Sequence, residues 1–358
     1  MTKVLVVATS RKTRGGITSV VKAHETGVQW EKYHCKWIET HRDGPSWRKL
    51  WYLATALIEY IILLPFYDIV HIHIATLQSA KRKNLFFMLA KAMGKKVIFH
   101  FHPSNEKFLF NKRVASLYRK LFDSSDKLLV LSEQWIRWLK ESIGQGPWMD
   151  KVEVLYNPCP IVNRTNVKRK KQILYAGTLI HRKGYDVLLK AFGKIAKKYP
   201  DWVVAFAGNP YLKEGINELE EGKKIAREFD IENQVVWLGW INGDEKERVF
   251  NESSIYCLAS EGEGFPMGVL DAWSYGIPCV MTPVGGIPDI VRDGIEGLVF
   301  PVGDVNALAN ALERMITSDA LRKRIVESAD EYVNGVFSVE IVNRKLGDIY
   351  QSLASAPK

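Results

Sequence analysis

The chain repeats one pattern: a short apolar run, then a loop rich in glycine and polar residues, then a stretch with helical spacing. The first run extends from Val4 to Ala8, and its loop reaches Gly15 and Gly16 before a helix begins near Ile17. Strands that alternate with helices are typical of a parallel α/β sheet. Ligands bind such sheets where the strands end, because the helices that begin there offer free N–H groups. We therefore expect the functional residues in these loops.

A polar run, residues 163–171, divides the chain near its middle. At 358 residues the chain has the length of two domains. We predict one Rossmann-like domain over residues 1–164 and a second over residues 165–335. Apolar residues at helical spacing follow in residues 336–358, and they predict a final helix.

Lysine and arginine outnumber aspartate and glutamate by 50 to 40, which gives a net charge of +10. The basic residues are spread in small blocks without a nucleic-acid-binding motif, so we expect no nucleic-acid partner. Each block alone is typical of a solvated helix face, but together the blocks favour an anionic membrane surface. The four cysteines lie far apart, which indicates free thiols, and no export signal opens the chain. We therefore expect a cytoplasmic protein, with peripheral attachment to the inner face of the cell membrane as a further expectation.

The segment from Trp51 to Leu64 is the stretch most similar to a membrane span. It is shorter than the about 20 apolar residues that cross a bilayer, and it contains Glu59. We predict a helix buried in the first domain. The alternative is a helix that lies on a membrane surface, which its aromatic residues and the basic pair Arg48 and Lys49 favour.

The most informative stretch runs from Ser260 to Pro288, where a strand end, a loop, a helix and a second strand follow one another. The loop opens with the acids Glu261 and Glu263, and the helix after it carries Asp271. Between these acids lie the residues that bring backbone close to a ligand, namely Gly264, Phe265, Pro266, Met267 and Gly268. An acid and free N–H groups at a strand end are suited to binding hydroxyl groups.

This stretch resembles the donor-sugar motif of the retaining glycosyltransferases of family 4, in which a glutamate, seven residues and a second glutamate follow in order. Glu263 matches the first acid, GFPMGVL fills the seven positions, and Asp271 stands where the family has the second glutamate. The resemblance implies a GT-B fold, with two facing Rossmann-like domains, an active site in the interdomain cleft, and a last helix that crosses back to the first domain. It also implies that Glu263 acts in catalysis and, with the following loop, binds the sugar, and that Asp271 binds the ribose.

A second motif lies after the strand from Gln172 to Ala176. Here family 4 has an arginine, then a lysine and a glycine; Lys183 and Gly184 match, and Thr178 stands at the arginine position. Arg182 is adjacent and supplies a second cation. Two cations at a helix start can neutralise a leaving diphosphate, so we predict catalytic roles for Lys183 and Arg182, and donor contacts at Thr178. By the same resemblance, Gly15 and Gly16 are predicted to bind the donor phosphates.

Histidines stand two apart in two predicted strands, at His71 and His73 and at His100 and His102. In a strand, residues two apart project to one face. The resemblance implies that His102, at a strand end, contacts the donor sugar and acts in catalysis, with His100 as a second candidate. The alternative is a buried histidine that is hydrogen-bonded to the backbone. A zinc site is the alternative, but no carboxylate or thiolate accompanies these histidines, so we predict no bound metal.

The resemblance implies a metal-independent hexosyltransferase without a cofactor. Its donor is a UDP- or GDP-sugar, and its acceptor is a hydroxyl of a glycan or a lipid-linked glycan in cell-surface polysaccharide or glycolipid synthesis. Two other functions suit the same sequence. One is a sugar-nucleotide epimerase or hydrolase of the same fold, and the other is a non-catalytic binder of nucleotide sugars, which the departures at Thr178 and Asp271 favour.

Overall fold

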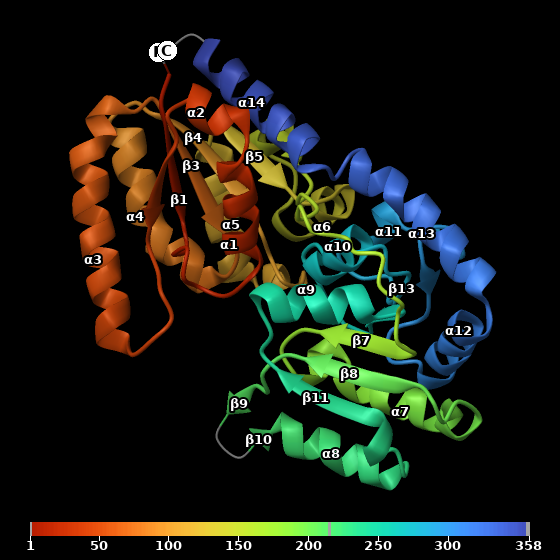
Figure 1. Ribbon diagram of the computed structural model, residues 1–358. Coiled ribbons are helices and arrows are strands. Elements are labelled where there is room, and N and C mark those ends of the chain that lie inside the picture. The colour runs from red at the N-terminus through yellow and green to blue at the C-terminus, as the bar shows by residue number, and fades with distance from the viewer. Residues whose placement is uncertain (1, 214–215, 356–358) are drawn as a thin grey trace. The chain divides into compact units, whose positions relative to one another are not determined.

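The computed structural model describes residues 2–213 and 216–355, which form two compact units (Figure 1). The first unit comprises Met1–Pro158 and Val336–Lys358, and the second comprises Cys159–Gly335. Each unit contains a parallel sheet of six strands with helices on its faces. The predicted α/β class is therefore confirmed.

In the first unit the strand order is β2-β1-β3-β4-β5-β6. The strands are β1 (Val4–Ala8), β2 (Lys36–Glu39), β3 (Ile69–Ile74), β4 (Lys96–Phe101), β5 (Lys127–Val130) and β6 (Val152–Val154). The helices are α1 (Gly16–Glu25), α2 (Val28–Lys32), α3 (Ser46–Leu63), α4 (Leu77–Ala92), α5 (Lys112–Ser124), α6 (Glu133–Ile143) and α14 (Val339–Ser355). These strands are short and apolar because both faces of a parallel sheet are covered.

The last helix, α14, belongs to the first unit although it ends the chain. Its buried residues Val342, Leu346 and Ile349 share one apolar cluster with Val6 of β1 and Val21 of α1. Burial of this helical stripe removes apolar surface from water, and that is the main force that holds α14 against the unit.

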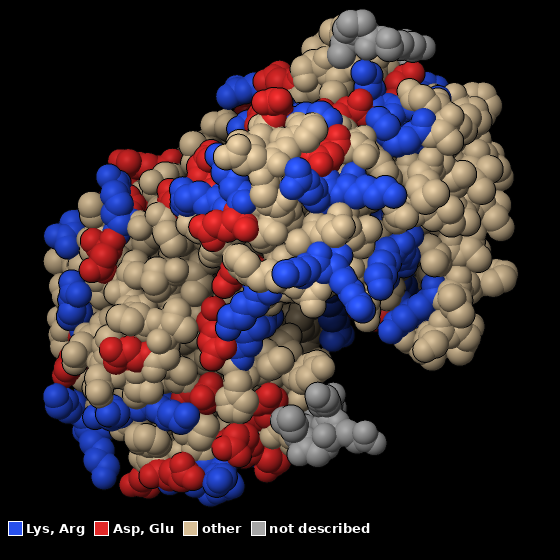
Figure 2. Space-filling view, turned by 180° about the vertical axis from the view of Figure 1, so that it is seen from behind, with Lys and Arg blue, Asp and Glu red and all other residues tan. Residues whose placement is uncertain are grey.

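Helix α3 differs from its prediction. Only Ala56 and Tyr60 are buried along it, and Trp51 and Ile62 are 66% and 61% exposed. The expectation of a buried helix is therefore wrong. Only one narrow stripe packs on the unit, where the Tyr60 hydroxyl donates to the Phe86 carbonyl at 2.8 Å. Figure 2 shows a surface almost free of charged side chains at the end where α3 lies.

Residues 46–66 are also longer than the apolar segment recognised in the sequence. By length and composition alone they suffice to cross a membrane, and they are the one such helix within residues 2–213 and 216–355. Length and apolar composition alone do not identify a membrane span, because core helices of other proteins have the same length and composition. The exposure of α3 is the more informative property.

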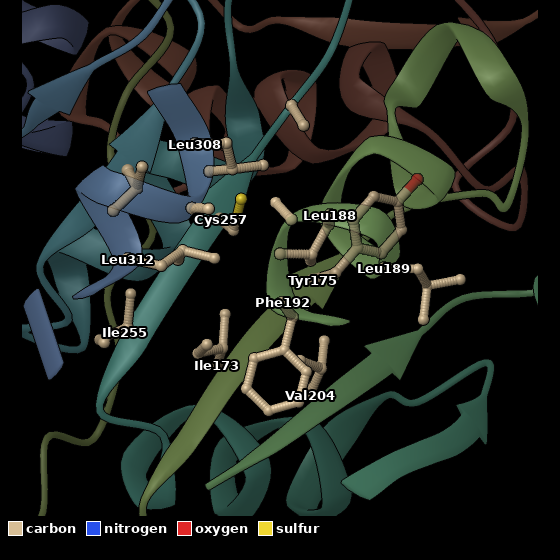
Figure 3. Close-up of a cluster of buried hydrophobic side chains, with 14 of the residues drawn as sticks. Ile173, Tyr175, Leu188, Leu189, Phe192, Val204, Ile255, Cys257, Leu308 and Leu312 are labelled. Carbon is tan, nitrogen blue, oxygen red and sulfur yellow. The ribbon is translucent and has the colours of Figure 1, made fainter. Parts of the chain in front are cut away.

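In the second unit the strand order is β11-β8-β7-β12-β13-β14. The strands are β7 (Gln172–Ala176), β8 (Val203–Ala207), β11 (Val235–Gly239), β12 (Ile255–Leu258), β13 (Cys279–Met281) and β14 (Leu298–Val299), beside a small pair, β9 (Leu212–Lys213) and β10 (Ile216–Asn217). The helices are α7 (Tyr185–Ile195), α8 (Glu218–Glu228), α9 (Gly243–Glu252), α10 (Met267–Ser274), α11 (Ile287–Ile290), α12 (Val305–Thr317) and α13 (Asp319–Asn334). Figure 3 shows part of the core, where Phe192 of α7 and Leu312 of α12 lie with Ile173 of β7.

The polar run 163–171 is held by the second unit. The Arg164 guanidinium makes two hydrogen bonds to the Asp330 carboxylate, at 2.7 and 3.0 Å, and donates to the Trp273 carbonyl at 2.9 Å. Arg169 donates to the carbonyls of Ser253 and Tyr275. The arginines of this run were typical of a solvated linker in the sequence, but in the structure they attach the run to the second unit.

Candidate active site

The candidate site lies where the second sheet changes direction. The chain first adds β8 and β11 on one side of β7 and then adds β13 and β14 beyond β12 on the other. Strands β7 and β12 are parallel neighbours, with Ile173 opposite Ile255. In open sheets of this kind, ligands bind at the carboxyl edge where the strand order reverses. The loop after β7 carries Lys183, and the loop after β12 carries Glu263.

Lys183 and Glu263 are in direct contact. The Lys183 ammonium lies 2.5 Å from Oε1 and 2.7 Å from Oε2 of Glu263. The Ser260 hydroxyl donates to the same Oε1 at 2.7 Å. Glu263 is buried, and a buried carboxylate needs a charged partner and hydrogen bonds of this kind. The structure thus brings together the two residues on which the predicted site most depends.

The loop that carries Glu263 is braced from two sides. The Arg182 guanidinium donates to the Gly262 carbonyl at 2.7 Å, and the Arg182 carbonyl accepts from the Glu261 N–H at 2.8 Å. Thr282, the residue after β13, donates its hydroxyl to the Ser260 carbonyl at 2.6 Å. Arg182 therefore contacts the loop in this structure, and a guanidinium has further N–H groups with which it could bind a phosphate.

Two glycines allow the loops to approach each other. Gly184 has a φ of +71°, and a Cβ there would lie 2.0 Å from the Ala259 carbonyl oxygen. Gly285 has a φ of +62°, and its Cβ would lie 2.4 Å from the Glu263 carbonyl oxygen. No side chain fits at either position, so glycine after Lys183 is a requirement of the backbone.

The predicted donor-binding loop leads into α10. Phe265 is buried, and a Cβ on Gly268 would lie 2.0 Å from the Tyr256 hydroxyl, so this helix start sits directly over β12. Gly264 lies between the buried acid and Phe265, Pro266 is the N-cap of the helix, and Met267 is its first residue. Asp271, one turn into α10, accepts from the Lys246 ammonium at 2.8 Å. Burial raises the pKa of Asp271, and Lys246 opposes that rise.

Thr178 presents its backbone at the same edge. Its carbonyl accepts from the Tyr175 hydroxyl at 2.8 Å, and Gly177 before it precedes the turn to Lys183. The structure shows no cation at this position, in keeping with the sequence. Lys183 and Arg182 remain the cations of this loop.

Gly15, Gly16 and His102 belong to the first unit, and each is a local feature of it. Gly15 precedes α1 with a φ of +139°, and no atom lies within 4 Å of the place where its Cβ would stand. Gly16 begins α1. His102 follows β4, and its Nε2 lies 3.0 Å from Nδ1 of His73. Burial lowers the pKa of His102 to about 3, so its imidazole is neutral.

Sequence reasoning missed Ser260 and Lys246 as partners of the two acids. Ser260 was visible as a polar residue at the end of an apolar strand, three residues before Glu263. Lys246 lies in α9, a charged helix without a motif, and no sequence signal connects it with Asp271.

The two Rossmann-like units, with polar groups at the carboxyl edge of the second, define the protein as one of the GT-B fold class. Residues 161–332, which contain the Lys183 and Glu263 loops, match the family model for glycosyl transferases group 1. The crystal structure of HepE from Anabaena, in complex with UDP and glucose, matches with a TM-score of 0.78 at 16% identity, covering 99% of this chain and 100% of that one. At this identity the likeness shows the fold.

Two curated relatives are similar in sequence. An uncharacterized glycosyltransferase of Haemophilus influenzae is 27% identical over 223 residues, which is 60% of this chain and 58% of the relative. The lipopolysaccharide core biosynthesis glycosyltransferase LpsE of Rhizobium meliloti is 28% identical over 186 residues, which is 52% of this chain and 50% of the relative. The chain thus spans only about half the length of these relatives.

Replacement of Gly184 tests the geometry of the site. We expect Gly184→Ala to lower the free energy of unfolding by at least about 1–3 kcal/mol, because alanine is strained at positive φ and its Cβ meets the Ala259 carbonyl. Chemical denaturation followed by circular dichroism measures the change. Gly177→Ala is the matched control, since its Cβ would meet the Tyr175 side chain no closer than 3.7 Å. Equal stability of the two variants would show that the loops do not approach as described.

Proposed function

We propose that the protein is a retaining glycosyltransferase of family 4, which moves a hexose from a UDP- or GDP-sugar to an acceptor hydroxyl. The observation that carries this proposal is the contact between Lys183 and Glu263 at the carboxyl edge of the second sheet. It supports the proposal because a cation for phosphate and an acid for hydroxyl groups meet at one point, inside the segment that matches the family model.

The contact leaves both groups able to bind more. A lysine ammonium has three N–H donors, and two of them point to Glu263 in this structure. The third can bind a diphosphate oxygen, while the carboxylate has lone pairs left for sugar hydroxyls. The bond to be broken joins the hexose to that diphosphate, so the pair would stand beside the reacting bond.

The chemistry requires stabilisation of the leaving diphosphate. As the bond from the anomeric carbon to the phosphate oxygen breaks, negative charge builds on the phosphate and positive charge on the sugar. Lys183 and Arg182 would bind the growing negative charge more tightly than the ground state, which lowers the barrier. Glu263 would hold the hexose, and Asp271 the ribose.

Retention of configuration is part of the proposal. In a front-face route the leaving phosphate oxygen accepts the proton of the acceptor hydroxyl, the acceptor oxygen bonds to the anomeric carbon from the same side, and no protein nucleophile is needed. The roles given above to Gly15, Gly16 and His102 stay predictions from the resemblance.

The two members of the pair should have separable effects. We expect Lys183→Ala to weaken UDP or GDP binding about tenfold or more, because a charge-assisted hydrogen bond contributes about 1.5–3 kcal/mol. We expect Glu263→Gln to leave nucleotide binding within a few-fold of the wild type, and to cut transfer at least about tenfold through lost contacts to the hexose. Calorimetry with the nucleotide and mass spectrometry of the glycosylated acceptor measure the two effects.

Lys194→Ala on α7, the helix that follows the Lys183 loop, is the matched control, because Lys194 is exposed and contacts Asn306 away from the pair. Unchanged binding in Lys183→Ala, or unchanged transfer in Glu263→Gln, would remove that residue from the proposed site. The donor is found first by thermal stabilisation across UDP- and GDP-hexoses, since a ligand of the native state raises its stability. Release of free sugar or an altered nucleotide without acceptor would favour the epimerase or hydrolase.

We also propose that transfer needs no divalent metal on the diphosphate, because Lys183 and Arg182 supply the positive charge. We expect the initial rate of transfer to be the same within about twofold with and without added Mg²⁺ or Mn²⁺. A rate that rises about tenfold or more with either ion would contradict this proposal.

The acceptor is proposed to be a lipid-linked glycan at the inner face of the cell membrane. Support comes from the α3 surface, which we define as the exposed apolar side chains Trp47, Leu50, Trp51, Ile58, Ile61 and Ile62. Tryptophan side chains favour the membrane interface, and the exposed cations Arg48 and Lys49 on the same helix favour anionic lipid. An open groove of about 510 Å³ lies beside α3, lined by Ile58, Ile62 and Tyr67 among others.

Helix α3 is proposed to lie in the membrane surface without crossing it, because its stripe of Ala56 and Tyr60 packs on the first unit. We expect the wild type to float with vesicles that contain phosphatidylglycerol, and to bind phosphatidylcholine vesicles much more weakly. The double variant Trp51→Ser, Ile62→Ser should lose about tenfold or more in binding, because two large apolar side chains no longer enter the interface.

Val28→Ser is the matched control, since Val28 on α2 is 83% exposed outside the α3 surface. Equal vesicle binding by the double variant and the wild type would contradict the membrane role of α3. A wild type that ignores vesicles and forms a dimer that the double variant cannot form would assign the α3 surface to a second copy of the chain.

A further inference from the structure

Five histidines are gathered on one face of the first sheet, where parallel sheets normally carry aliphatic side chains. His71 and His73 come from β3, and His100 comes from β4. His102 directly follows β4, and His24 comes from α1. The strand register sets His73 opposite His100. All five side chains are buried.

Most of these imidazoles keep a ring nitrogen without a partner. Among the described residues, no hydrogen-bond partner reaches Nε2 of His24, His71 or His73, or either nitrogen of His100. A buried polar atom left unpaired costs about 1–3 kcal/mol. A whole group of them on one face indicates that something outside the protein chain binds there.

The hydrogen bonds around the cluster indicate which nitrogens carry lone pairs. The amide oxygen of Asn343 accepts from Gln29 Nε2 at 3.0 Å, so His24 Nδ1, 2.8 Å away, donates to it and His24 Nε2 is a lone pair. His71 Nδ1 lies 2.7 Å from the Tyr350 hydroxyl, and His73 Nδ1 lies 3.0 Å from His102 Nε2. When His71 and His73 donate through Nδ1 in the same way, their Nε2 atoms are lone pairs as well.

We propose that His71, His73 and His100 bind one divalent metal ion of the zinc class. One ring nitrogen from each of the three lies within 4.8 Å of the others. Zn–N bonds of about 2.0–2.1 Å hold ligands of a tetrahedral site about 3.4 Å apart, so small rotations of the side chains complete the site. His24 Nε2 is the protein atom available for a fourth position, since the His24 and His100 ring centres are 6.3 Å apart.

The ligand chemistry selects the ion. Imidazoles suit Zn²⁺ and its neighbours in the first transition row, and all three proposed ligands are imidazoles. Hard cations such as Mg²⁺ and Ca²⁺ require oxygen ligands, and the cluster offers none. Tyr350 and His102 would orient His71 and His73 through hydrogen bonds to their Nδ1 atoms.

The site would join β3 to β4 and, through Tyr350, to α14, and its role would be structural. It would place no metal on the diphosphate of the proposed transfer reaction, and it shares with the predicted transferase site only His102, which would orient His73. The sequence alone predicts no metal here, because neither a carboxylate nor a thiolate accompanies the histidines. The structure leads to a different conclusion, because ring nitrogens without hydrogen-bond partners among the described residues lie close together at His71, His73 and His100.

The test measures metal in the full chain, produced without a histidine tag in medium containing zinc. We expect about one zinc ion per chain by elemental analysis, and a higher midpoint of thermal unfolding than for chain produced in zinc-depleted medium. His73→Gln and His100→Gln should each lose the bound zinc. His34→Asn, an exposed histidine at a positive φ that asparagine tolerates, should keep it.

X-ray absorption on the zinc-loaded wild type decides the matter even if the cluster variants fail to fold. The proposal requires a nitrogen-rich first shell with the multiple scattering of at least three imidazoles. It is overturned if the wild type holds no stoichiometric zinc, if His100→Gln retains it, or if the spectrum shows thiolate or mainly carboxylate ligands.

Discussion

The second unit depends on one ion pair, Lys183 with Glu263, placed where its sheet changes direction. A buried carboxylate is costly unless it is neutralised and hydrogen-bonded. Here the ammonium comes from the loop after β7 and the carboxylate from the loop after β12, so the pair exists only if these two loops meet. Two further features hold the loops together. Arg182 donates a hydrogen bond to the Gly262 carbonyl, and Gly184 and Gly285 have no side chain that would keep the backbones apart.

The sheet of the first unit carries buried polar side chains that need hydrogen-bond partners. Strands β3 and β4 place histidines where a core normally has aliphatic side chains. Helix α14 supplies two polar partners to the histidine cluster, Asn343 and Tyr350. A helix from the end of the chain thus supplies hydrogen bonds to a face built by residues near its beginning. A buried polar face is stable only when nearly all of its polar atoms have hydrogen-bond partners or ligands. Neither ring nitrogen of His100 has a partner among the described residues, and this supports the proposal of a metal ligand there.

The parts of the protein that could be predicted are those encoded locally. Each strand, glycine loop and helix start follows its predecessor closely in sequence, so the α/β class and the positions of Lys183 and Glu263 relative to strand ends were readable. The Lys246 partner of Asp271 was not, because it requires the packing of α9 beside α10. The burial of α3 was predicted wrongly, since an apolar helix has the same composition whether it is covered by its own domain or by another surface.

Each of two acids in the candidate site is paired with a lysine, and this bears on how the site would act in the proposed reaction. Glu263 is paired with Lys183 and Asp271 with Lys246, each lysine coming from an element other than that of its acid. Pairing of this kind avoids the cost of unpaired buried charge. In the proposed reaction, the donor diphosphate would add negative charge beside Lys183, and Glu263 would then share that cation with the ligand. Binding energy used for that rearrangement in the ground state would be recovered as charge moves onto the phosphate, so the arrangement would favour the transition state over the bound substrate.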